Sequence, residues 1–326
     1  MRAIVLDDYG DEDVMRLGEV QPPAMSRGMV RIAVQAAGVN RADLLQRRGL
    51  YPPPPGASEI LGLECAGRIA EVGEGATPWE VGQRVMALLP GGGYAEEAVV
   101  DAGSVIPVPA TMEPAAAGGF PEVFLTAFLN LVVLGGMGEG TVALVHGGSG
   151  GVGTAAIQIG RVLGAHLLVT AGSDERCRRC LELGAAVAIN YRRDDFVDRC
   201  RQYTDGAGVE LILDCVGADY LTRNLQALAP GGRLVVIGLM SGARAELDLA
   251  DMLRRRIAVI GSSLRSRSPA DKSRLIASFT DRLGGALEDG RLHPIVDRAL
   301  PLADAPTAHR ALAAGEIFGK LVLTTG

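Results

Sequence analysis

The stretch TVALVHGGSGGVGTAAIQIG, residues 141 to 160, decides the fold of the chain. An aliphatic run enters five glycines between positions 147 and 153, and an amphipathic, helix-like pattern follows them. Gly148, Gly150 and Gly153 fit the spacing G-x-G-x-x-G, in which the first glycine allows a tight turn, the second lets the backbone approach a pyrophosphate, and the third lets helix pack on strand. The stretch therefore predicts a strand, a phosphate-binding loop and a helix from about Gly151 to Leu163.

The residues around this loop show the alternation of strands and helices that a nucleotide domain requires. From about Glu122 onward, apolar runs predict strands at 141–147, 166–172, 187–191, 209–217, 232–239 and 257–262, with helical patterns between most of them. Continuous hydrophobic strands separated by helices indicate a parallel sheet covered on both faces. This context favours a nucleotide site over a glycine-rich turn that only joins packed elements.

The two ends of the chain have a different texture. Short β-branched runs at 30–39, 67–73, 83–89 and 95–100 predict strands, and PPPPG at 52–56 predicts a stiff loop. After about residue 264 come a helix-rich segment and a last strand, GKLVLTT, which are too small to fold alone. We therefore expect an α/β protein with one β-rich domain (1–121 plus 265–326) interrupted by a nucleotide domain (122–264).

Composition narrows the function. The chain has 326 residues, of which 48% are hydrophobic and 21% charged, and this is long enough for two domains with their own cores. The net charge of −6 argues against nucleic-acid binding. No apolar run is long enough to span a bilayer, and the first residues resemble neither a signal nor a transit peptide. Five cysteines without a framework spacing are typical of reduced thiols, so a cytoplasmic location is expected.

The residues after the second nucleotide-domain strand indicate which nucleotide binds. An NAD site commonly carries an acidic residue at this strand end to hold the ribose. Here Ser173 is expected to cap a helix whose first turn contains Asp174, and Arg176 follows, able to reach a 2′-phosphate. Tyr191, at the end of the third strand, could add a hydroxyl. The pattern favours NADPH, although an Asp174 side chain turned toward the ribose would favour NADH.

Several motifs together resemble one family. The segments NRADLLQRRGLYPPPPGASEILGLECAG (40–67), TAFLNL (126–131), GGVGTAAIQ (150–158), LILDCVG (211–217), GLMSG (238–242) and SSLRSRS (262–268) resemble the zinc-free quinone oxidoreductases. These form the zeta-crystallin branch of the medium-chain dehydrogenase/reductase superfamily. The resemblance implies a GroES-like β-rich catalytic domain interrupted by a Rossmann doubly wound parallel sheet. It also implies NADPH-dependent quinone reduction in a cleft between the domains, and a homodimer formed through the edge strand near 257–262.

Zinc-containing members of the superfamily carry ligands at positions that this chain fills differently. On the resemblance, the three positions are Asn40, Leu63 and Glu122. An amide, an alkyl group and one carboxylate do not provide the nitrogen- and sulfur-rich set that zinc needs. The segment ALLPGGGYAEEAVV (87–100) also lacks the cysteines of a structural zinc lobe. The prediction is a protein without metal.

The resemblance places three catalytic candidates, Asn40, Tyr51 and Asp43, at the substrate cleft. Alternatives remain for each: Asn40 could bond only to backbone in its turn, Tyr51 could pack on the prolines, and Asp43 could cap the helix that begins there. The cofactor candidates lie on loops and strand ends of the nucleotide domain and beside its borders. They are Val123, Thr126, Gly148, Ser149, Gly150, Gly151, Val152, Gly153, Gly172, Ser173, Arg176, Tyr191, Val216, Gly238, Leu239, Met240 and Leu264.

Two other features have structural interpretations. Cys177 and Cys180 form C-x-x-C on the expected second helix of the nucleotide domain, without a partner pair, so surface or half-buried thiols are expected. His146 ends the first strand and is expected to be a satisfied core histidine. No Ser/His/Asp or Cys/His arrangement can be assembled from the sequence.

Three functions stay open. The first is zinc-independent, NADPH-dependent reduction of quinones or related conjugated carbonyls, by hydride or by one-electron transfer. The second is a 2-enoyl or alkenal reductase, which needs a positioned proton donor; Tyr51 is the one candidate visible in the sequence. The third is an NADPH-binding protein without meaningful catalysis, such as a redox sensor.

Overall fold

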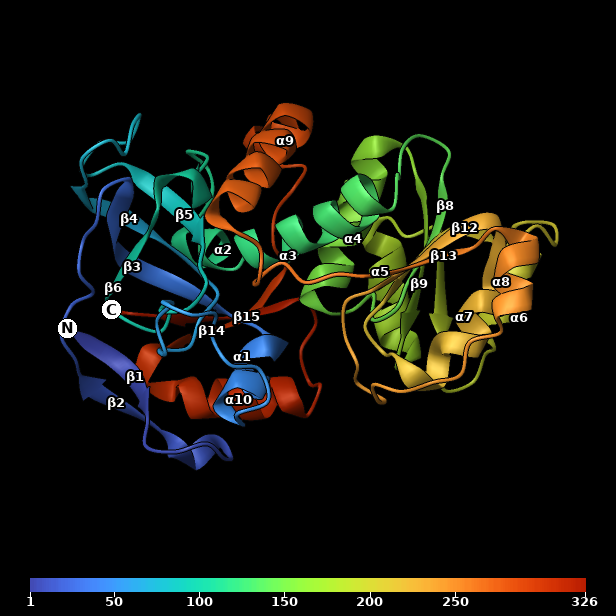
Figure 1. Cartoon of the computed structure of the whole chain (residues 1–326), viewed down its shortest axis with the longest axis horizontal. Coiled ribbons are helices and arrows are strands. Elements are labelled where there is room, and N and C mark those ends of the chain that lie inside the picture. Colours follow the sequence, from blue (N-terminus) through green and yellow to red (C-terminus); the bar gives the residue numbers. More distant parts are fainter. The chain divides into compact units, whose positions relative to one another are not determined.

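The computed structural model describes all 326 residues and divides them into two compact units (Figure 1). The first unit contains Met1–Leu125 and Leu264–Gly326, and the second contains Thr126–Ser263. Each unit is built around its own sheet. No helix in the chain combines the length and apolar character needed to cross a lipid bilayer.

The second unit contains a six-stranded sheet in which every pair of neighbours is parallel. Its order is β10(Val187–Asn190), β9(His166–Ala171), β8(Val142–Val145), β11(Val209–Asp214), β12(Leu228–Val236) and β13(Ala258–Gly261). The order reverses at β8, which carries the glycine loop, and such a switch point is where doubly wound sheets bind ligands. The predicted parallel sheet is confirmed.

Helices cover this sheet, as continuous apolar strands require. They are α4(Gly151–Leu163), α5(Asp174–Leu183), α6(Phe196–Tyr203), α7(Leu221–Ala227) and α8(Leu249–Arg255). The limits of α4 match the predicted helix, because small residues fill its buried face and a left-handed Gly164 ends it. A π-helix at Phe128–Leu134 follows α3(Pro121–Ala127) without an intervening loop. Leu144, Leu168, Ile212 and Phe196 belong to the core between sheet and helices.

The first unit contains a seven-stranded sheet and a separate pair of strands. The main order is β14(Val296–Pro301), β15(Lys320–Thr324), β3(Met29–Val39), β4(Glu64–Val72), β5(Arg84–Leu88) and β7(Val105–Pro107), with β6(Glu97–Asp101) paired to β3. The separate antiparallel pair is β1(Arg2–Leu6) and β2(Met15–Glu19). Its helices are α1(Arg41–Arg47), α2(Pro114–Gly118), α9(Pro269–Glu288) and α10(Ala305–Ala313). The C-terminal strand β15 pairs with β3, so the tail does rejoin the N-terminal β structure.

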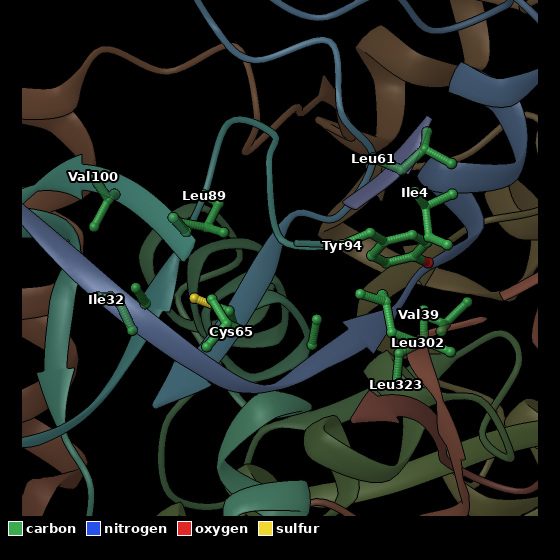
Figure 2. Close-up of a cluster of buried hydrophobic side chains, with 14 of the residues drawn as sticks. Ile4, Ile32, Val39, Leu61, Cys65, Leu89, Tyr94, Val100, Leu302 and Leu323 are labelled. Atoms are coloured by element: carbon green, nitrogen blue, oxygen red, sulfur yellow. The ribbon is translucent and has the colours of Figure 1, made fainter. Parts of the chain in front are cut away.

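A single hydrophobic core holds the N-terminal and C-terminal parts of this unit together. Figure 2 shows Ile4, Val39, Tyr94, Leu302 and Leu323 within it, although they come from distant parts of the sequence. Burying an aliphatic or aromatic side chain of this size stabilises a fold by about 1.5–3 kcal/mol. This core fixes β15 beside β3 and thereby brings the first residue of β15, Lys320, to the end of β3.

Candidate functional site

The glycine loop of the second unit leaves no room for a side chain at two of its motif glycines, because neighbouring segments approach them closely. A Cβ atom on Gly153 would lie 2.3 Å from the Gly147 carbonyl oxygen, and one on Gly148 would lie 2.5 Å from the Val169 side chain. The left-handed turn, however, belongs to Gly147, whose φ is +76°, and Gly148 has no such φ. Gly148 lies inside the tight turn that the Gly150 amide closes on the Gly147 carbonyl, as expected of the first motif glycine, and Gly147 adds the positive φ that the motif spacing did not predict.

The end of β9 leads into the helix cap that the sequence predicted. Ser173 is the N-cap of α5, and its Oγ accepts a hydrogen bond from the Arg176 amide at 3.3 Å, as predicted. The exposed Asp174 carboxylate accepts from Asn190 Nδ2 at 2.8 Å and from an Arg193 guanidinium nitrogen at 3.0 Å. The hydrogen bond from Asn190 is the largest cause that lowers the pKa of Asp174. Asp174 is thus engaged by β10 and its following turn.

A chain of buried hydrogen bonds connects the loop after β8 to the loop after β11. His146 Nδ1 lies 3.1 Å from Thr170 Oγ1, and His146 Nε2 lies 2.7 Å from Asn224 Oδ1. Asn224 Nδ2 donates to Asp214, whose carboxylate accepts the Val216 and Gly217 amides. Thr170 Oγ1 also accepts the Gly147 amide. The prediction of a satisfied core histidine is confirmed, and burial lowers the pKa of His146 to about 4.

The loop after β12 carries three cofactor candidates. A Cβ atom on Gly238 would lie 2.7 Å from the Cys215 carbonyl oxygen, so only glycine lets these two strand ends approach so closely. Leu239 and Met240 are 57% and 55% exposed, unusual values for side chains of this size. Ser241 ties the loop to Val216 through its amide and its hydroxyl.

In the first unit, Asn40 belongs to a buried charged cluster. Lys320 Nζ donates to Asn40 Oδ1 at 2.7 Å, to Glu64 Oε1 at 2.7 Å and to the Val39 carbonyl at 3.1 Å. Asn40 Nδ2 donates to Glu64 Oε1 at 2.9 Å, and the Glu122 amide donates to Glu64 Oε2 at 2.8 Å. The side chains of Lys320 and Glu64 are only 3% and 0% exposed. Asn40 therefore bonds mainly to this ion pair, with a longer bond to the Gly38 carbonyl.

Asp43 lies at the start of α1 and collects three hydrogen bonds. Its carboxylate accepts the Asn40 amide, the Gly62 amide and the Tyr94 hydroxyl. The Asn40 bond is the helix-capping role that the sequence suggested, with Asn40 itself as the N-cap. Burial raises the pKa of Asp43 to about 6, against the effect of these hydrogen bonds. The Tyr94 hydroxyl in turn lies 3.1 Å from His309 Nε2, which is buried and far away in the sequence.

Tyr51 is held by an arginine rather than by the four prolines alone. The Arg265 guanidinium lies 5.2 Å from the centre of the Tyr51 ring, and its NH1 nitrogen donates to the Tyr51 carbonyl at 3.1 Å. The same guanidinium donates to Gln46 Oε1 on α1 and to the Pro90 carbonyl. Lys272 of α9 donates to the Arg265 carbonyl. Arg265 thus fixes the loop that carries Tyr51 to α1 and to the residue 90 turn.

Glu122 stands beside this cluster with an unusual carboxyl. It is the second residue of α3, is half-buried, and makes no hydrogen bond or ion pair through its side chain. Desolvation is the largest cause that raises the pKa of Glu122 to about 8, and the neighbouring Glu64 carboxylate raises it further. Lys320 and Lys272 oppose this shift. A carboxyl with this pKa is mostly protonated at neutral pH.

The donor set does not fit a zinc ion. Leu63 is buried and offers no donor, and the Asn40 and Glu64 oxygens already surround the Lys320 ammonium. No three His, Cys, Asp or Glu side chains in the chain group as ligands. Zinc prefers nitrogen and sulfur donors in tetrahedral sets, which these residues do not supply.

Three further cofactor candidates lie close in the sequence to the boundaries of the two units. Val123 and Leu264 are buried in the first unit, and Thr126 is the first residue of the second.

Cys177 and Cys180 are both buried, so the expectation of surface or half-buried thiols was wrong, and burial raises the pKa of both. Sequence reasoning missed Glu64, Lys320, Tyr94, His309 and Arg265, because each acts through partners that are distant in the sequence.

Family models match both parts of the chain. An alcohol dehydrogenase GroES-like domain matches residues 26–110, and a zinc-binding dehydrogenase domain matches residues 151–281. The chain belongs to the medium-chain dehydrogenase/reductase superfamily, which confirms the predicted α/β fold with a GroES-like part and a Rossmann part. Within that superfamily it is an oxidoreductase similar to the quinone oxidoreductases over its full length.

Two curated relatives illustrate this. The quinone oxidoreductase of Rattus norvegicus is 32% identical over 329 residues, which cover 99% of this chain and 97% of that protein. One component of the phenolphthiocerol/phthiocerol polyketide synthase of Mycobacterium tuberculosis is 33% identical over 322 residues, which cover 98% of this chain. This chain spans only 14% of that synthase component.

Two solved structures are similar to this chain over nearly its full length. The Escherichia coli quinone oxidoreductase complexed with NADPH has a TM-score of 0.88 at 28% identity and covers 99% of this chain and 100% of its own. The CurK enoyl reductase has a TM-score of 0.85 at 28% identity and covers 99% of this chain and 98% of its own.

Proposed function

We propose that this chain reduces quinones and related conjugated carbonyls with NADPH and without zinc. The observation that carries the proposal is the cluster at Asn40, where an ammonium and an amide occupy the region in which zinc members of the superfamily hold a metal. The full-length similarity to quinone oxidoreductases, one of them solved with NADPH, supports the same function. We propose a one-electron route as the alternative to hydride transfer.

A quinone suits a site of this kind. A nicotinamide would supply the hydride when bound, and a hydroquinone anion is stable enough to be protonated by water or a weak acid. Lewis-acid assistance, which alcohol oxidation needs to stabilise an alkoxide, is therefore unnecessary. The work of the chain is to hold a flat acceptor and keep it oriented. We propose Asn40, Tyr51 and Asp43 for that work, with Asp43 acting through Asn40 and the Tyr51 ring fixed by Arg265.

The preference for NADPH rests on the end of β9. Asp174, the first acidic residue after this strand, is engaged by Asn190 and Arg193, and we propose that this keeps it from selecting the ribose of NAD. Ser173, Arg176 and Tyr191 are the proposed 2′-phosphate ligands. A Cβ atom on Gly172 would lie 2.8 Å from the Tyr191 hydroxyl, which places that hydroxyl at the same strand end. The glycine loop, Val216 and the loop from Gly238 to Met240 are proposed to hold the rest of the cofactor, as are Val123, Thr126 and Leu264.

A variant pair tests the cofactor assignment. Arg176→Glu removes a charge-assisted contact with phosphate, which is worth roughly 1.5–3 kcal/mol, so the KM for NADPH is expected to rise by about 10- to 100-fold or more. The KM for NADH is expected to stay nearly unchanged. Arg178→Glu is the matched control, because it makes the same charge change on α5 at a residue that pairs with Glu182. Equal losses with both cofactors would refute the 2′-phosphate assignment.

A second function is favoured by a specific observation. Reduction of 2-enoyl or alkenal compounds needs an acid for the substrate α-carbon, and Glu122 is a mostly protonated residue whose backbone amide binds the same Glu64 carboxylate as Asn40. The structural similarity to an enoyl reductase supports this candidate. The third candidate, a redox sensor without catalysis, is tested by the same assay.

The deciding experiment follows NADPH oxidation by absorbance with a panel of ortho- and para-quinones and conjugated enals. The proposal expects turnover of quinones that is unchanged after dialysis against a chelator, and no stoichiometric zinc by elemental analysis. Tight NADPH binding without consumption of any acceptor would favour the sensor. We further propose a cytoplasmic homodimer that pairs through the free edge of β13.

A further inference from the structure

We propose that Glu122 is the acid that protonates the reduced substrate, and that it equips this chain to reduce conjugated enals and enoyl compounds as well as quinones. The inference deepens the proposed function and rests on it. It names a catalytic acid that neither the sequence motifs nor the similarity to known proteins assigns.

The first support is position. Glu122 and Asn40 bond to opposite oxygens of one carboxylate: the Glu122 amide donates to Glu64 Oε2 and Asn40 Nδ2 donates to Glu64 Oε1. The backbone of Glu122 is thus held by the same carboxylate as Asn40, the residue that we propose to line the substrate site. Thr126, a proposed nicotinamide contact, follows Glu122 by four residues on the helical α3, so the two share one face of that helix.

The second support is the state of the carboxyl itself. Both Glu64 oxygens are engaged by donors, whereas the Glu122 carboxyl makes no hydrogen bond or ion pair within the chain. The fold therefore does not use the acid proton of Glu122. Because the residue is only half-buried, this proton remains accessible for exchange. A buried polar group is normally paired. A half-buried carboxyl without a partner suits a group whose partner is the substrate.

The third support is the charge around it. Glu64 on β4 and Asp43 on α1 favour the protonated form, and Lys320 on β15 and Lys272 on α9 favour the carboxylate. Arg265 also interacts electrostatically with Glu122. With desolvation as the largest cause, the pKa of Glu122 rises to about 8. General acids work best when their pKa lies near the working pH, which is the case here. The three nearby cations can stabilise the carboxylate after the proton leaves.

In the proposed step, each bond that forms is matched by a bond that breaks. A reduced nicotinamide would supply, when bound, the hydride that the β-carbon of a conjugated carbonyl accepts. The carbon–carbon π electrons move toward the carbonyl, the Glu122 O–H bond breaks, and its proton forms the new bond at the α-carbon. With a quinone, the same proton goes to the oxyanion. The Glu122 carboxylate then takes a proton from solvent.

The two substrate classes should depend on Glu122 to different extents. A hydroquinone anion accepts a proton from water readily, but an α-carbon needs a positioned acid. Glu122→Gln keeps the size of the side chain and removes the acid. It is expected to lower kcat for enals by roughly 10²- to 10⁴-fold, and kcat for quinones by less than about tenfold, with little change in the KM for NADPH. Glu122→Asp is expected to restore part of the enal activity, and Glu288→Gln, an exposed glutamate on α9, is the control.

Two measurements separate an acid from a structural residue. In the unmodified chain, enal turnover is expected to be level at lower pH and to fall as pH rises past about 8, and this fall should be absent in Glu122→Gln. In the free protein, without cofactor or substrate, infrared difference spectroscopy should show a carboxylic-acid C=O band that is lost over the same range. That band should be absent in Glu122→Gln and present in Glu288→Gln.

Several outcomes would overturn the inference. Equal losses with enals and quinones, no infrared band that depends on Glu122, or an enal loss that appears in Tyr51→Phe and not in Glu122→Gln would each do so. These differ from a failure of the proposed function itself, in which the unmodified chain would consume no acceptor with NADPH. The infrared titration reports on Glu122 in either case.

Discussion

The buried His146 predicts that the second unit loses stability in mild acid. In the unfolded chain this histidine has the ordinary pKa of 6.5, and in the folded chain burial lowers its pKa to about 4. Between these values the unfolded chain binds a proton that the folded chain does not, so the stability is fully present above pH 6.5 and falls as pH falls. The difference of about 2.5 pH units, at 1.36 kcal/mol each, amounts to about 3 kcal/mol near pH 4 and about 2 kcal/mol at pH 5.

The hydrogen bonds explain why the fold rejects this proton. Asn224 Nδ2 donates to Asp214, so Asn224 Oδ1 must accept from His146 Nε2. His146 Nδ1 is then the unprotonated nitrogen and accepts from the Thr170 hydroxyl, whose oxygen already accepts the Gly147 amide. A proton on Nδ1 would place a donor against a hydroxyl that is oriented to donate. Burial is nevertheless the largest cause of the lowered pKa of His146.

The assay must report on the second unit alone. Hydrogen exchange at amides of β8 and β11 gives the free energy of opening for this sheet, and it can be compared between pH 7 and pH 5. His146→Gln is expected to lower stability at pH 7 by about 1–3 kcal/mol, because buried partners lose a hydrogen bond. Its deficit should shrink by about 2 kcal/mol at pH 5. His293→Gln, at an exposed histidine, should track the unmodified chain. A deficit that stays constant with pH would show that His146 does not titrate as argued.

Two further predictions concern the first unit and the edge strand. Lys320→Met leaves the fully buried Glu64 without its counter-charge and should lower the free energy of unfolding, measured in urea, by about 3–5 kcal/mol. The double variant Lys320→Met with Glu64→Gln should recover part of this loss. A loss below about 1 kcal/mol would contradict a buried pair. Because the Ser262 amide donates inward to β12, the neighbouring Gly261 amide points out of the sheet edge. Gly261→Pro removes that donor and should shift a dimer toward monomer in size-exclusion chromatography with light scattering; an unmodified chain that is already monomeric would contradict the proposed pairing.

Local pattern predicted the nucleotide domain well. The helix expected from Gly151 to Leu163 has these limits, and each of the six expected parallel strands is present, because burial on both faces leaves a strong apolar signal in short segments. The same reasoning placed Gly148 in a turn but did not identify Gly147 as the residue with a positive φ. The spacing of the motif says which glycines are needed, but the positive φ depends on how the strand leaves the sheet.

The candidate site of the first unit could be predicted only in part. The sequence directed attention to Asn40, Asp43 and Glu122, yet the group that binds Asn40 most closely is Lys320, 280 residues away. Such a contact depends on β15 pairing with β3, and strand pairing over that distance leaves no local signal. Likewise, no periodicity links Tyr94 to His309.

The absence of zinc ligands and the presence of Lys320 are two parts of one electrostatic arrangement. The ammonium lies 2.7 Å from both Asn40 Oδ1 and Glu64 Oε1, so the oxygens that could attract a cation already hold one. A divalent ion brought within about 4 Å of this ammonium would meet a repulsion of about 8 kcal/mol at an effective dielectric constant near 20. Lys320 pairs with Glu64, and desolvation together with the Glu64 carboxylate raises the pKa of Glu122 against the opposing charge of Lys320. Glu64 thus has two effects: its ion pair with Lys320 disfavours a metal, and its charge helps to keep Glu122 protonated, so under the proposed function proton donation replaces Lewis-acid chemistry.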